Sequence, residues 1–518
     1  MPLPVLECLR QQWQWQLTCF FLVLLPLLFL ALGTIMRSSY TKGRHLHLPP
    51  GPRRLPVVGN LHQILGSLPH RSLRDLARRH GPVMLLRLGS VPTVVVSAAA
   101  AAREVMKTHD ADCCSRPDTP GARRLSYGHK DVAFTPYGQH WREMRKLFIV
   151  ELLSMRRVRA AWYAREAQVD KLICELSSFG GKQVSLEDHI FGVMDGIFGT
   201  VAFGNIYGTE QFAHRKHFHD AIDDAMGVMA SFSAEDYFPN AAGRLVDCLT
   251  GVVSRRERVF RELDAFFDTI IEQHLDASRA TANSDLVDVL IGLMKEHQGS
   301  LRFSRDHIKA LLHNIFLGGV DTSSVIMVWA MAELIRKPWV LRKVQDEIRA
   351  IVGDEERVQP DDMPNLKYLN MVVKETMRLH PAVPFLVPRE TMRGVTIGGY
   401  NVPAKTRLLV NAWAIGRDPA SWGPNAEEFD PDRFEGSDVD YNGAHFELVP
   451  FGAGRRICPG LAMGETNVMF TLANLLYCFD WALPQGMAPE DVSMEEAGGL
   501  AVHKKTPLLL VPTRYKCH

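Results

Sequence analysis

The spacing of apolar residues predicts helices over most of this chain, after a first segment that contains no charge. Residues 17–36 read LTCFFLVLLPLLFLALGTIM. As a helix, these 20 uncharged residues would span about 30 Å, the thickness of a bilayer core. The basic residues Arg37, Lys42 and Arg44 follow at once. Because basic flanks remain on the cytoplasmic side, the sequence predicts that residues 1–36 form a single transmembrane anchor and that the remaining chain faces the cytosol.

A cleaved signal peptide is the alternative for this segment, with Ala31-Leu32-Gly33 as a candidate cleavage site. Signal peptides have apolar cores of about 7–15 residues, so the longer run favours an uncleaved anchor. Residues 37–60 are basic and then proline-rich, and the stretch 48–60 reads LPPGPRRLPVVGN. Since proline restricts its own φ and the residue before it, residues 37–60 are predicted to form a stiff, non-helical hinge.

The body, residues 61–518, shows helical periodicity interrupted by short strand-like runs. Residues 83–96 predict two strands around Gly89-Ser90, and residues 98–108 predict a helix. Helical spacing dominates residues 139–375, and residues 395–415 contain further strand-like runs. Residues 461–483 predict a long apolar helix, whereas 275–285 and 435–447 read as irregular surface segments. The expected fold class is mainly α with small, discontinuous β-sheets.

Composition narrows the classes of function. The 518 residues include 59 Lys and Arg against 58 Asp and Glu, a formal net charge of +1. Nucleic-acid-binding proteins usually carry a strong basic excess, so no nucleic-acid partner is expected. Nine cysteines are few for this length and odd in number, which disfavours a disulfide scaffold and favours a reducing compartment.

One cysteine lies in a glycine-rich loop with the form Phe-x-x-Gly-x-Arg-x-Cys-x-Gly. Residues 451–460 read FGAGRRICPG. A thiolate that binds iron needs positive potential and nearby backbone N–H groups, and the glycines allow the backbone to fold closely around Cys458. An isolated cysteine is more often inert, but a chance match to five fixed positions is on the order of one in ten thousand for this length. The loop therefore predicts that the Cys458 thiolate binds the iron of a haem b. It also predicts that Arg456 lies beside a haem propionate.

With this loop, the sequence resembles the cytochrome P450 superfamily of haem-thiolate monooxygenases. The segments KETMR (374–378) and FDPDRF (429–434) match two further family motifs, in the family's order. The resemblance implies that Glu375, Arg378 and Arg433 form a charged cluster that braces the cysteine loop, although a lone Glu-x-x-Arg is usually solvated. It makes residues 61–518 the haem-thiolate catalytic domain. The residues that it assigns to cofactor binding are Trp141, Arg145, Arg389, Phe451, Arg456 and Cys458.

Residues 304–337 predict one long helix, with Ser304 as N-cap and Pro338 after its end. The sequence GGVDTSS (318–324) lies near its middle, and each glycine there costs roughly 0.5–1 kcal/mol. The resemblance implies that Asp321 and Thr322 deliver protons during oxygen cleavage and are the catalytic residues. The alternative is a helix that packs through small residues, with Thr322 bonded to its own backbone.

The resemblance extends to the substrate class. The segments ASFSAEDYFPNAAGRL and FEGSDVDYNGAHFELVPFGAGRRICPG resemble grass P450s that act on aromatic aldoximes in cyanogenic glucoside biosynthesis. This resemblance implies conversion of an aldoxime of the 4-hydroxyphenylacetaldehyde oxime type, via the nitrile, to an α-hydroxynitrile. The stretch AVPFL (382–386) differs from the corresponding stretch of those enzymes. Such a difference in a substrate pocket can change which substrate the enzyme prefers. The apolar residues expected to line the substrate pocket are Phe134, Phe316, Val383, Phe385 and Leu500.

Other functions remain open from the residues themselves. They are oxidation of another small metabolite, such as an indole or a terpenoid, a haem-thiolate dehydratase or isomerase that uses no oxygen, and a non-enzymatic haem sensor. The monooxygenase interpretation implies O2, electrons from NADPH through a separate NADPH–cytochrome reductase, and an endoplasmic reticulum membrane. The basic residues expected to dock that reductase are Arg142, Lys146, Arg156, Arg157 and Arg159, although such a run is often only a solvated face.

Overall fold

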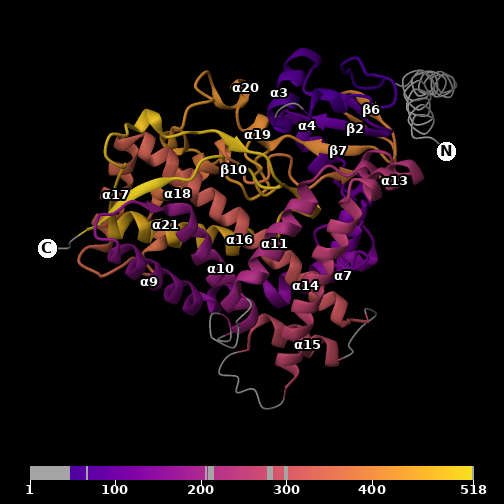
Figure 1. Ribbon diagram of the computed structural model, residues 1–518. Coiled ribbons are helices and arrows are strands. Elements are labelled where there is room, and N and C mark those ends of the chain that lie inside the picture. Colours follow the sequence, from indigo (N-terminus) through magenta and orange to yellow (C-terminus); the bar gives the residue numbers. More distant parts are fainter. Residues whose placement is uncertain are drawn as a thin grey trace, which may run out of the picture.

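The computed structural model describes residues 47–65, 68–204, 207, 215–276, 284–296 and 302–515. Helices make up most of this part of the chain (Figure 1). The longer helices are α3 (Pro69–His80), α7 (Gln139–Leu147), α9 (Trp162–Ser178), α10 (Leu186–Phe203), α11 (Arg215–Ala230), α13 (Ala241–Leu249), α14 (Val252–Leu275), α15 (Leu286–Glu296), α16 (Arg305–Arg336), α17 (Pro338–Val352), α18 (Lys367–Leu379) and α21 (Leu461–Cys478). The short ones are α4 (Ala99–Arg103), α5 (Asp110–Cys113), α6 (Pro120–Leu125), α8 (Met155–Ala160), α12 (Ala234–Tyr237), α19 (Ala412–Ile415) and α20 (Pro419–Trp422).

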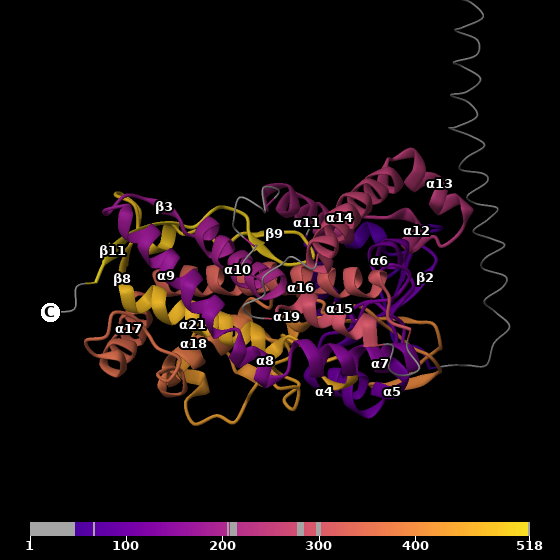
Figure 2. The same cartoon turned by 90° about the horizontal axis from the view of Figure 1, so that it is seen from below.

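Helix α16 is the centre of the helical part. It crosses the molecule between α10 on one side and α21 and α18 on the other (Figures 1 and 2). Its backbone begins after Ser304, whose N–H donates to Nδ1 of His307 at 3.2 Å, and it ends before Pro338. Among the described helices, only α16 is long and apolar enough to cross a membrane, but 78% of its apolar window is buried inside the protein. Its hydrophobicity therefore belongs to the core.

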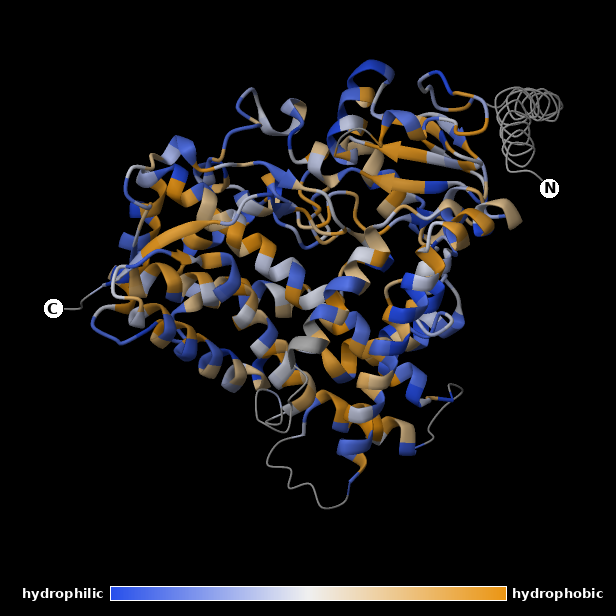
Figure 3. Cartoon of the chain, in the orientation of Figure 1, coloured by the Kyte–Doolittle hydropathy of each residue, from blue (hydrophilic) through white to orange (hydrophobic). Residues whose placement is uncertain are grey.

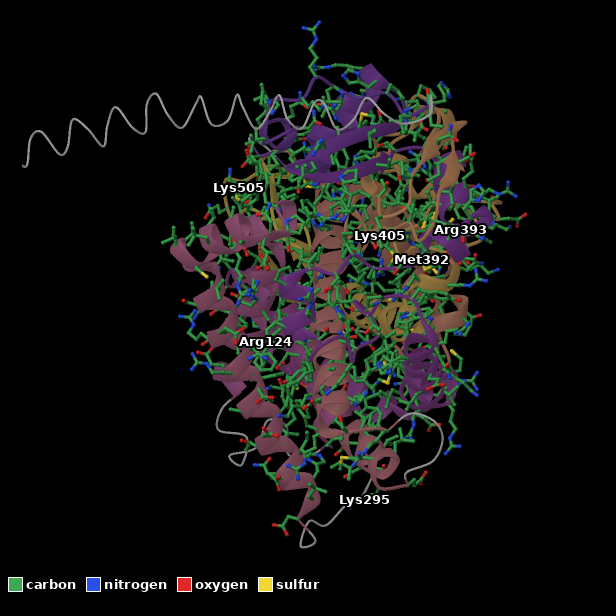
Figure 4. The ribbon with its side chains drawn as sticks, turned by 90° about the vertical axis from the view of Figure 1, so that its right-hand side faces the viewer. Arg124, Lys295, Met392, Arg393, Lys405 and Lys505 are labelled. Atoms are coloured by element: carbon green, nitrogen blue, oxygen red, sulfur yellow. The ribbon has the colours of Figure 1, made fainter. Side chains whose placement is uncertain are left out.

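The sheets are small, and several of their strands pack against helices of the core. The largest has the order β1-β2-β7-β4. Strands β1 (Val83–Leu88) and β2 (Val91–Val96) are antiparallel, β2 and β7 (Arg407–Val410) are parallel, and β7 and β4 (Arg389–Glu390) are antiparallel. The remaining strands are β3 (Val184–Ser185), β5 (Val395–Ile397), β6 (Tyr400–Val402), β8 (Phe479–Ala482), β9 (Glu496–Ala497), β10 (His503–Lys504) and β11 (Leu509–Arg514). Exposed ion pairs flank the large sheet, and Figure 4 marks two of their members, Arg393 and Lys405.

Most sequence predictions about these elements are confirmed. The two strands around Gly89-Ser90 and the long helix after Ser304 have the predicted bounds to within a residue or two. The predicted helix 98–108 is α4 followed by a π-helical turn, η3 (Glu104–Thr108). The predicted helix 461–483 is wrong at its end, because residues 479–482 bury every second side chain and pair with β11. The predicted anchor, residues 1–36, lies outside the described residues.

Candidate active site

The cysteine loop lies directly before α21 and turns tightly around the sulfur of Cys458. The Cys458 N–H donates to the Phe451 carbonyl at 2.9 Å, and the short 3-10 turn η9 (Gly454–Arg456) lies between them. Gly454 has a φ of +69°, and a Cβ there would stand 2.2 Å from the Met106 carbonyl oxygen. Only glycine fits at that position. Burial raises the pKa of the Cys458 thiol, whereas the Gly460 N–H and the Arg145 guanidinium act in the opposite direction.

A cavity separates this loop from the middle of α16. Phe451 and Cys458 line one side of it, and Gly318 and Thr322 line the other. A Cβ on Gly318 would meet no atom within 4 Å, so the helix surface there is open toward the cavity. The sulfur and the central helix therefore face a common space.

Four arginines also line the cavity. Arg389 forms a buried ion pair with Asp110 at 2.9 Å, and Arg145 donates to the Ile457 carbonyl at 2.6 Å. Arg456 donates to three backbone carbonyls, including those of Cys114 and Thr135. The fourth, Arg116, was not singled out in the sequence analysis. It is buried and donates to the carbonyls of residues 133, 387 and 388.

Three of these charges lack a counter-ion. Within the described residues, none of Arg116, Arg145 and Arg456 has a carboxylate in ion-pair contact, and only Arg389 is paired. Burial, together with the neighbouring arginines, lowers the pKa of Arg116 well below its ordinary value, and burial lowers that of Arg456 to about 9. Buried charges are normally paired. A dianionic ligand beside the Cys458 sulfur would supply the missing counter-charges, and haem, with two propionates and a thiolate-binding iron, fits this set of side chains.

Trp141, which was expected to contact the cofactor, packs against one of the cavity-lining arginines. It is not among the cavity-lining residues. Its indole N–H donates to the Val132 carbonyl at 3.0 Å, and the Arg456 guanidinium carbon lies 4.0 Å from its ring centroid. The indole therefore fixes Arg456 rather than reaching the cavity itself.

The adjacent glycines of α16 fit both interpretations, a helix turn that faces the active site and a helix that packs through small residues. The Thr322 hydroxyl lines the cavity and donates to the Gly318 carbonyl at 2.7 Å. Gly319 packs against the helix α10, where a Cβ would stand 2.5 Å from the Phe198 ring. Both glycines line the cavity, and Gly319 also allows a close contact between α16 and α10.

Asp321 does not line the cavity. Its Oδ1 lies 3.1 Å from Nε2 of His503 on β10, and its Oδ2 is buried without a hydrogen-bond partner. His503 is a second residue that the sequence analysis did not single out. No local pattern links positions 321 and 503, so only the fold reveals the pair.

One of the five expected pocket residues lines the cavity. Val383 lines the cavity, together with Ala382 and Leu386, but Phe134, Phe316, Phe385 and Leu500 do not. Phe316 lies two residues from Gly318, about 200° around the helix, and stacks on Phe203 with ring centroids 5.0 Å apart.

The other three lie beside the cavity without lining it. Phe134 packs in a small cluster with Ala122 and Leu317. Phe385 packs against the β1–β2 side of the molecule, because the chain turns at Leu386, which has a φ of +55°. Leu500 belongs to the turn between β9 and β10 and is only partly buried.

The lining also includes Asn314, another residue not singled out beforehand. Its Oδ1 accepts from the N–H groups of Val132 and Ala133, and its Nδ2 donates to Asp131 at 3.0 Å. Asn314 thereby holds the loop before α7 against α16. In the sequence, this role is indicated by the position of Asn314, which lies about two helical turns before Thr322 and therefore on the same face of the helix.

The charged cluster behind the cysteine loop has the composition that the motifs implied. Glu375 and Arg378 are both fully buried and meet at 2.6 and 2.7 Å. Arg433 donates to Glu375 at 2.9 Å, and the Asp430 N–H donates to the same oxygen. Arg378 also binds three carbonyls in the segment 416–428. The cluster therefore ties α18 to the segment that leads to the cysteine loop.

Comparison with known proteins agrees with this geometry. The family model described as Cytochrome P450 matches residues 49–511. The chain belongs to the cytochrome P450 family. This membership confirms the predicted enzyme class, a haem-dependent monooxygenase that uses O2 and electrons from a reductase, and the mainly helical fold.

Relatives of this P450 have named activities. It is 63% identical over 517 residues to the 4-hydroxyphenylacetaldehyde oxime monooxygenase of Sorghum bicolor, covering 98% of this chain and 96% of that one. It is 48% identical over 519 residues to the 2-methylbutanal oxime monooxygenase of Manihot esculenta, covering 100% of both. Among solved structures, a zebra fish cytochrome P450 with progesterone matches with a TM-score of 0.73 and 24% identity, over 87% of this chain and 99% of that one. This last similarity supports the fold alone.

Proposed function

We propose that this P450 converts an aromatic aldoxime of the 4-hydroxyphenylacetaldehyde oxime type, via the nitrile, to an α-hydroxynitrile in cyanogenic glucoside biosynthesis. The observation that carries the proposal is the 63% identity, over nearly the whole chain, to an enzyme with that oxime in its name. The cavity supports it, because the lining contributed by residues 382–387 and by α16 is mostly apolar. Such walls suit an aromatic ring of this size.

The cavity residues have distinct roles in this proposal. The Cys458 thiolate would bind the haem iron, and Arg116, Arg145, Arg389 and Arg456 would neutralise and orient the propionates. When bound, haem would supply redox-active iron for dehydration of the oxime and for the use of O2. The apolar walls hold the aromatic ring and exclude water. The side-chain carboxyl and hydroxyl of residues 321 and 322 hold and move the protons that hydroxylation consumes.

The two proposed steps make different demands on these side chains. Dehydration of the aldoxime, R–CH=N–OH to R–C≡N and water, consumes neither O2 nor added protons. Hydroxylation of the nitrile's α-carbon needs a proton supply, so Thr322 and Asp321 act mainly in the second step. Loss of a positioned proton donor costs about 10²–10⁴-fold.

The test is incubation of microsomes that contain this P450 and a reductase with a panel of aldoximes, with and without NADPH. Nitrile followed by α-hydroxynitrile is expected from the phenolic oxime. Cys458→Ser microsomes serve as control and should form neither product. Turnover of an indole or terpenoid instead, with every oxime left intact, would refute the substrate class.

We further propose the domain arrangement expected from the sequence: an anchor at 1–36, a hinge at 37–60 and a catalytic domain at 61–518, at the endoplasmic reticulum membrane. Exposed apolar side chains on α13 support contact with a membrane, among them Leu245 and Leu249, the latter 78% exposed. Helix α13 lies at the edge of the molecule and includes pale to orange segments (Figure 3). Deletion of residues 1–36 should release the protein from microsomes in part while the haem spectrum stays intact. Recovery of a cleaved, secreted protein would contradict an anchor.

We propose that the reductase docks on the surface of α7 and α8, next to the cysteine loop. Four of the five basic residues expected there are exposed, and none of the five forms an ion pair within the described residues. Arg157 is half-buried and donates to the Glu151 carbonyl. The exposed apolar side chains of Val150 and Met155 lie between the basic ones. Charge reversal at Arg156 and Arg157 should slow haem reduction at low salt, with a smaller effect at high salt. An unchanged rate at low salt would refute the site.

A further inference from the structure

The ion pair between Asp321 and His503 joins the solvent to the helix that lines the cavity. Nε2 of His503 lies 3.1 Å from Oδ1 of Asp321, and the two side chains are 31% and 15% exposed. His503 lies on β10, and Lys505, two residues further along, is at the surface (Figure 4). One end of the pair therefore reaches water, and the other lies within α16.

We propose that His503 is the proton donor on the solvent side of this active site and feeds Thr322 through Asp321. The inference rests on the proposed function, in which hydroxylation follows R–H + O2 + 2e⁻ + 2H⁺ → R–OH + H2O. The two electrons come from the reductase, whereas the two protons must reach a cavity whose walls are mostly apolar.

The route has three groups in sequence. The His503 imidazolium gives the proton on Nε2 to Oδ1 of Asp321, which becomes a neutral carboxylic acid. Rotation of that carboxyl, whose Oδ2 is buried without a partner, presents the proton inward. Thr322 is the next residue and lines the cavity, and its hydroxyl oxygen has free lone pairs to accept this proton. The hydroxyl's own proton, donated to the Gly318 carbonyl at rest, then passes into the cavity. The neutral imidazole is then reprotonated from water.

The surroundings of His503 favour its protonated form. Its ring stacks on Phe191 of α10, with centroids 5.9 Å apart. Burial alone would lower the pKa of His503, but its hydrogen bond with Asp321 and the carboxylates of Asp321, Glu187 and Asp223 raise it above the ordinary value. A raised pKa favours the imidazolium, which is the form that donates a proton.

The first test measures the pair without turnover. Diethyl pyrocarbonate modifies neutral imidazole, so the pH dependence of His503 labelling, followed by mass spectrometry, reports its pKa in the full-length protein. The apparent pKa should be higher in the wild type than in Asp321→Asn. His445 is a matched reference, because its side chain is also 31% exposed and lies 3.7 Å from Glu447. An equal His503 pKa in both proteins would overturn the electrostatic coupling.

The second test separates proton supply from structure. With oxime and NADPH, His503→Gln should form nitrile at the wild-type rate, but should lower its conversion to α-hydroxynitrile roughly 10²-fold and shift that step's pH profile. Imidazole added to His503→Ala should restore the second step, since the ring space beside Phe191 is vacated. His445→Gln should behave as the wild type.

The outcomes decide between the two proposals. Equal loss of both steps, or no rescue by imidazole, would mean that His503 only supports the fold. If the wild-type enzyme converts no oxime, the substrate proposal fails, and the labelling comparison between wild type and Asp321→Asn still decides whether His503 and Asp321 are coupled.

Discussion

Adjacent glycines on α16 provide a matched pair of substitutions. Gly318 and Gly319 are on the same helix and change to alanine with the same gain in helix propensity, about 0.5–1 kcal/mol each. Their surroundings differ. A Cβ on Gly318 enters open space, whereas a Cβ on Gly319 stands 2.5 Å from two carbons of the buried Phe198 ring.

The propensity gain cancels when the two variants are compared, so the difference measures packing alone. Inserting a methyl group into a packed site costs typically about 1–3 kcal/mol. We expect Gly318→Ala to be as stable as the wild type or up to about 1 kcal/mol more stable. Gly319→Ala should be less stable than Gly318→Ala by about 1–3 kcal/mol. The Phe198 ring also lines the cavity, so it has one direction in which to yield.

The assays are urea unfolding for stability and substrate difference spectra for the cavity. Gly318→Ala places a methyl group in the cavity, so it should weaken binding of the oxime without loss of stability. The main effect of Gly319→Ala should be a loss of stability, because its methyl group meets the Phe198 ring. Equal stabilities of the two variants, or a larger loss for Gly318→Ala, would refute the assignment of the close helix–helix contact to Gly319 alone.

Three further predictions follow from the site and its supports. Cys458→Ser should abolish the red-shifted band of the reduced, carbon-monoxide-bound haem; persistence of that band would exclude Cys458 as the ligand. Glu375→Gln leaves the fully buried Arg378 without its counter-charge and should cost about 3–5 kcal/mol in urea unfolding. The control Glu495→Gln, which breaks an ion pair whose two side chains are 62% and 65% exposed, should cost at most about 1 kcal/mol, and similar losses would contradict the role of burial. Burial alone would raise the pKa of Glu496, but hydrogen bonds from His70 and Arg71 hold it at about 2, against 4.5 ordinarily. Because the pKa is depressed, this stabilisation is complete above about pH 4.5 and declines as the pH falls toward 2; unfolding between pH 6 and pH 3 should show about 2 kcal/mol of loss that Glu496→Gln lacks.

Local patterns in the chain determined the part of the site that lies on one continuous segment. The cysteine loop spans ten residues, and Glu375 and Arg378 are one helical turn apart, so their geometry follows from local structure. The bounds of α16 follow likewise from a serine N-cap and a terminal proline.

The sequence could not show which side chains reach the cavity. Helical spacing puts Phe316 on α16, but only the packing of α10, α11 and α14 shows that its ring faces them and not the cavity. Phe385 and Leu386 are neighbours, and the positive φ at Leu386 sends one away from the cavity and the other into it. Apolar residues look alike in sequence whether they line a cavity or fill a core.

The sequence by itself determined the class of chemistry, the mainly helical fold and the cysteine loop, because these depend on short-range spacing and residue type. Only the tertiary structure decided that Arg116 adds an unpaired charge to the cavity and that His503 meets Asp321. Arg116 lies 340 residues before Arg456, and His503 lies 182 residues after Asp321. Burial and charge pairing arise between segments that meet only when the chain folds, so no local pattern carries them.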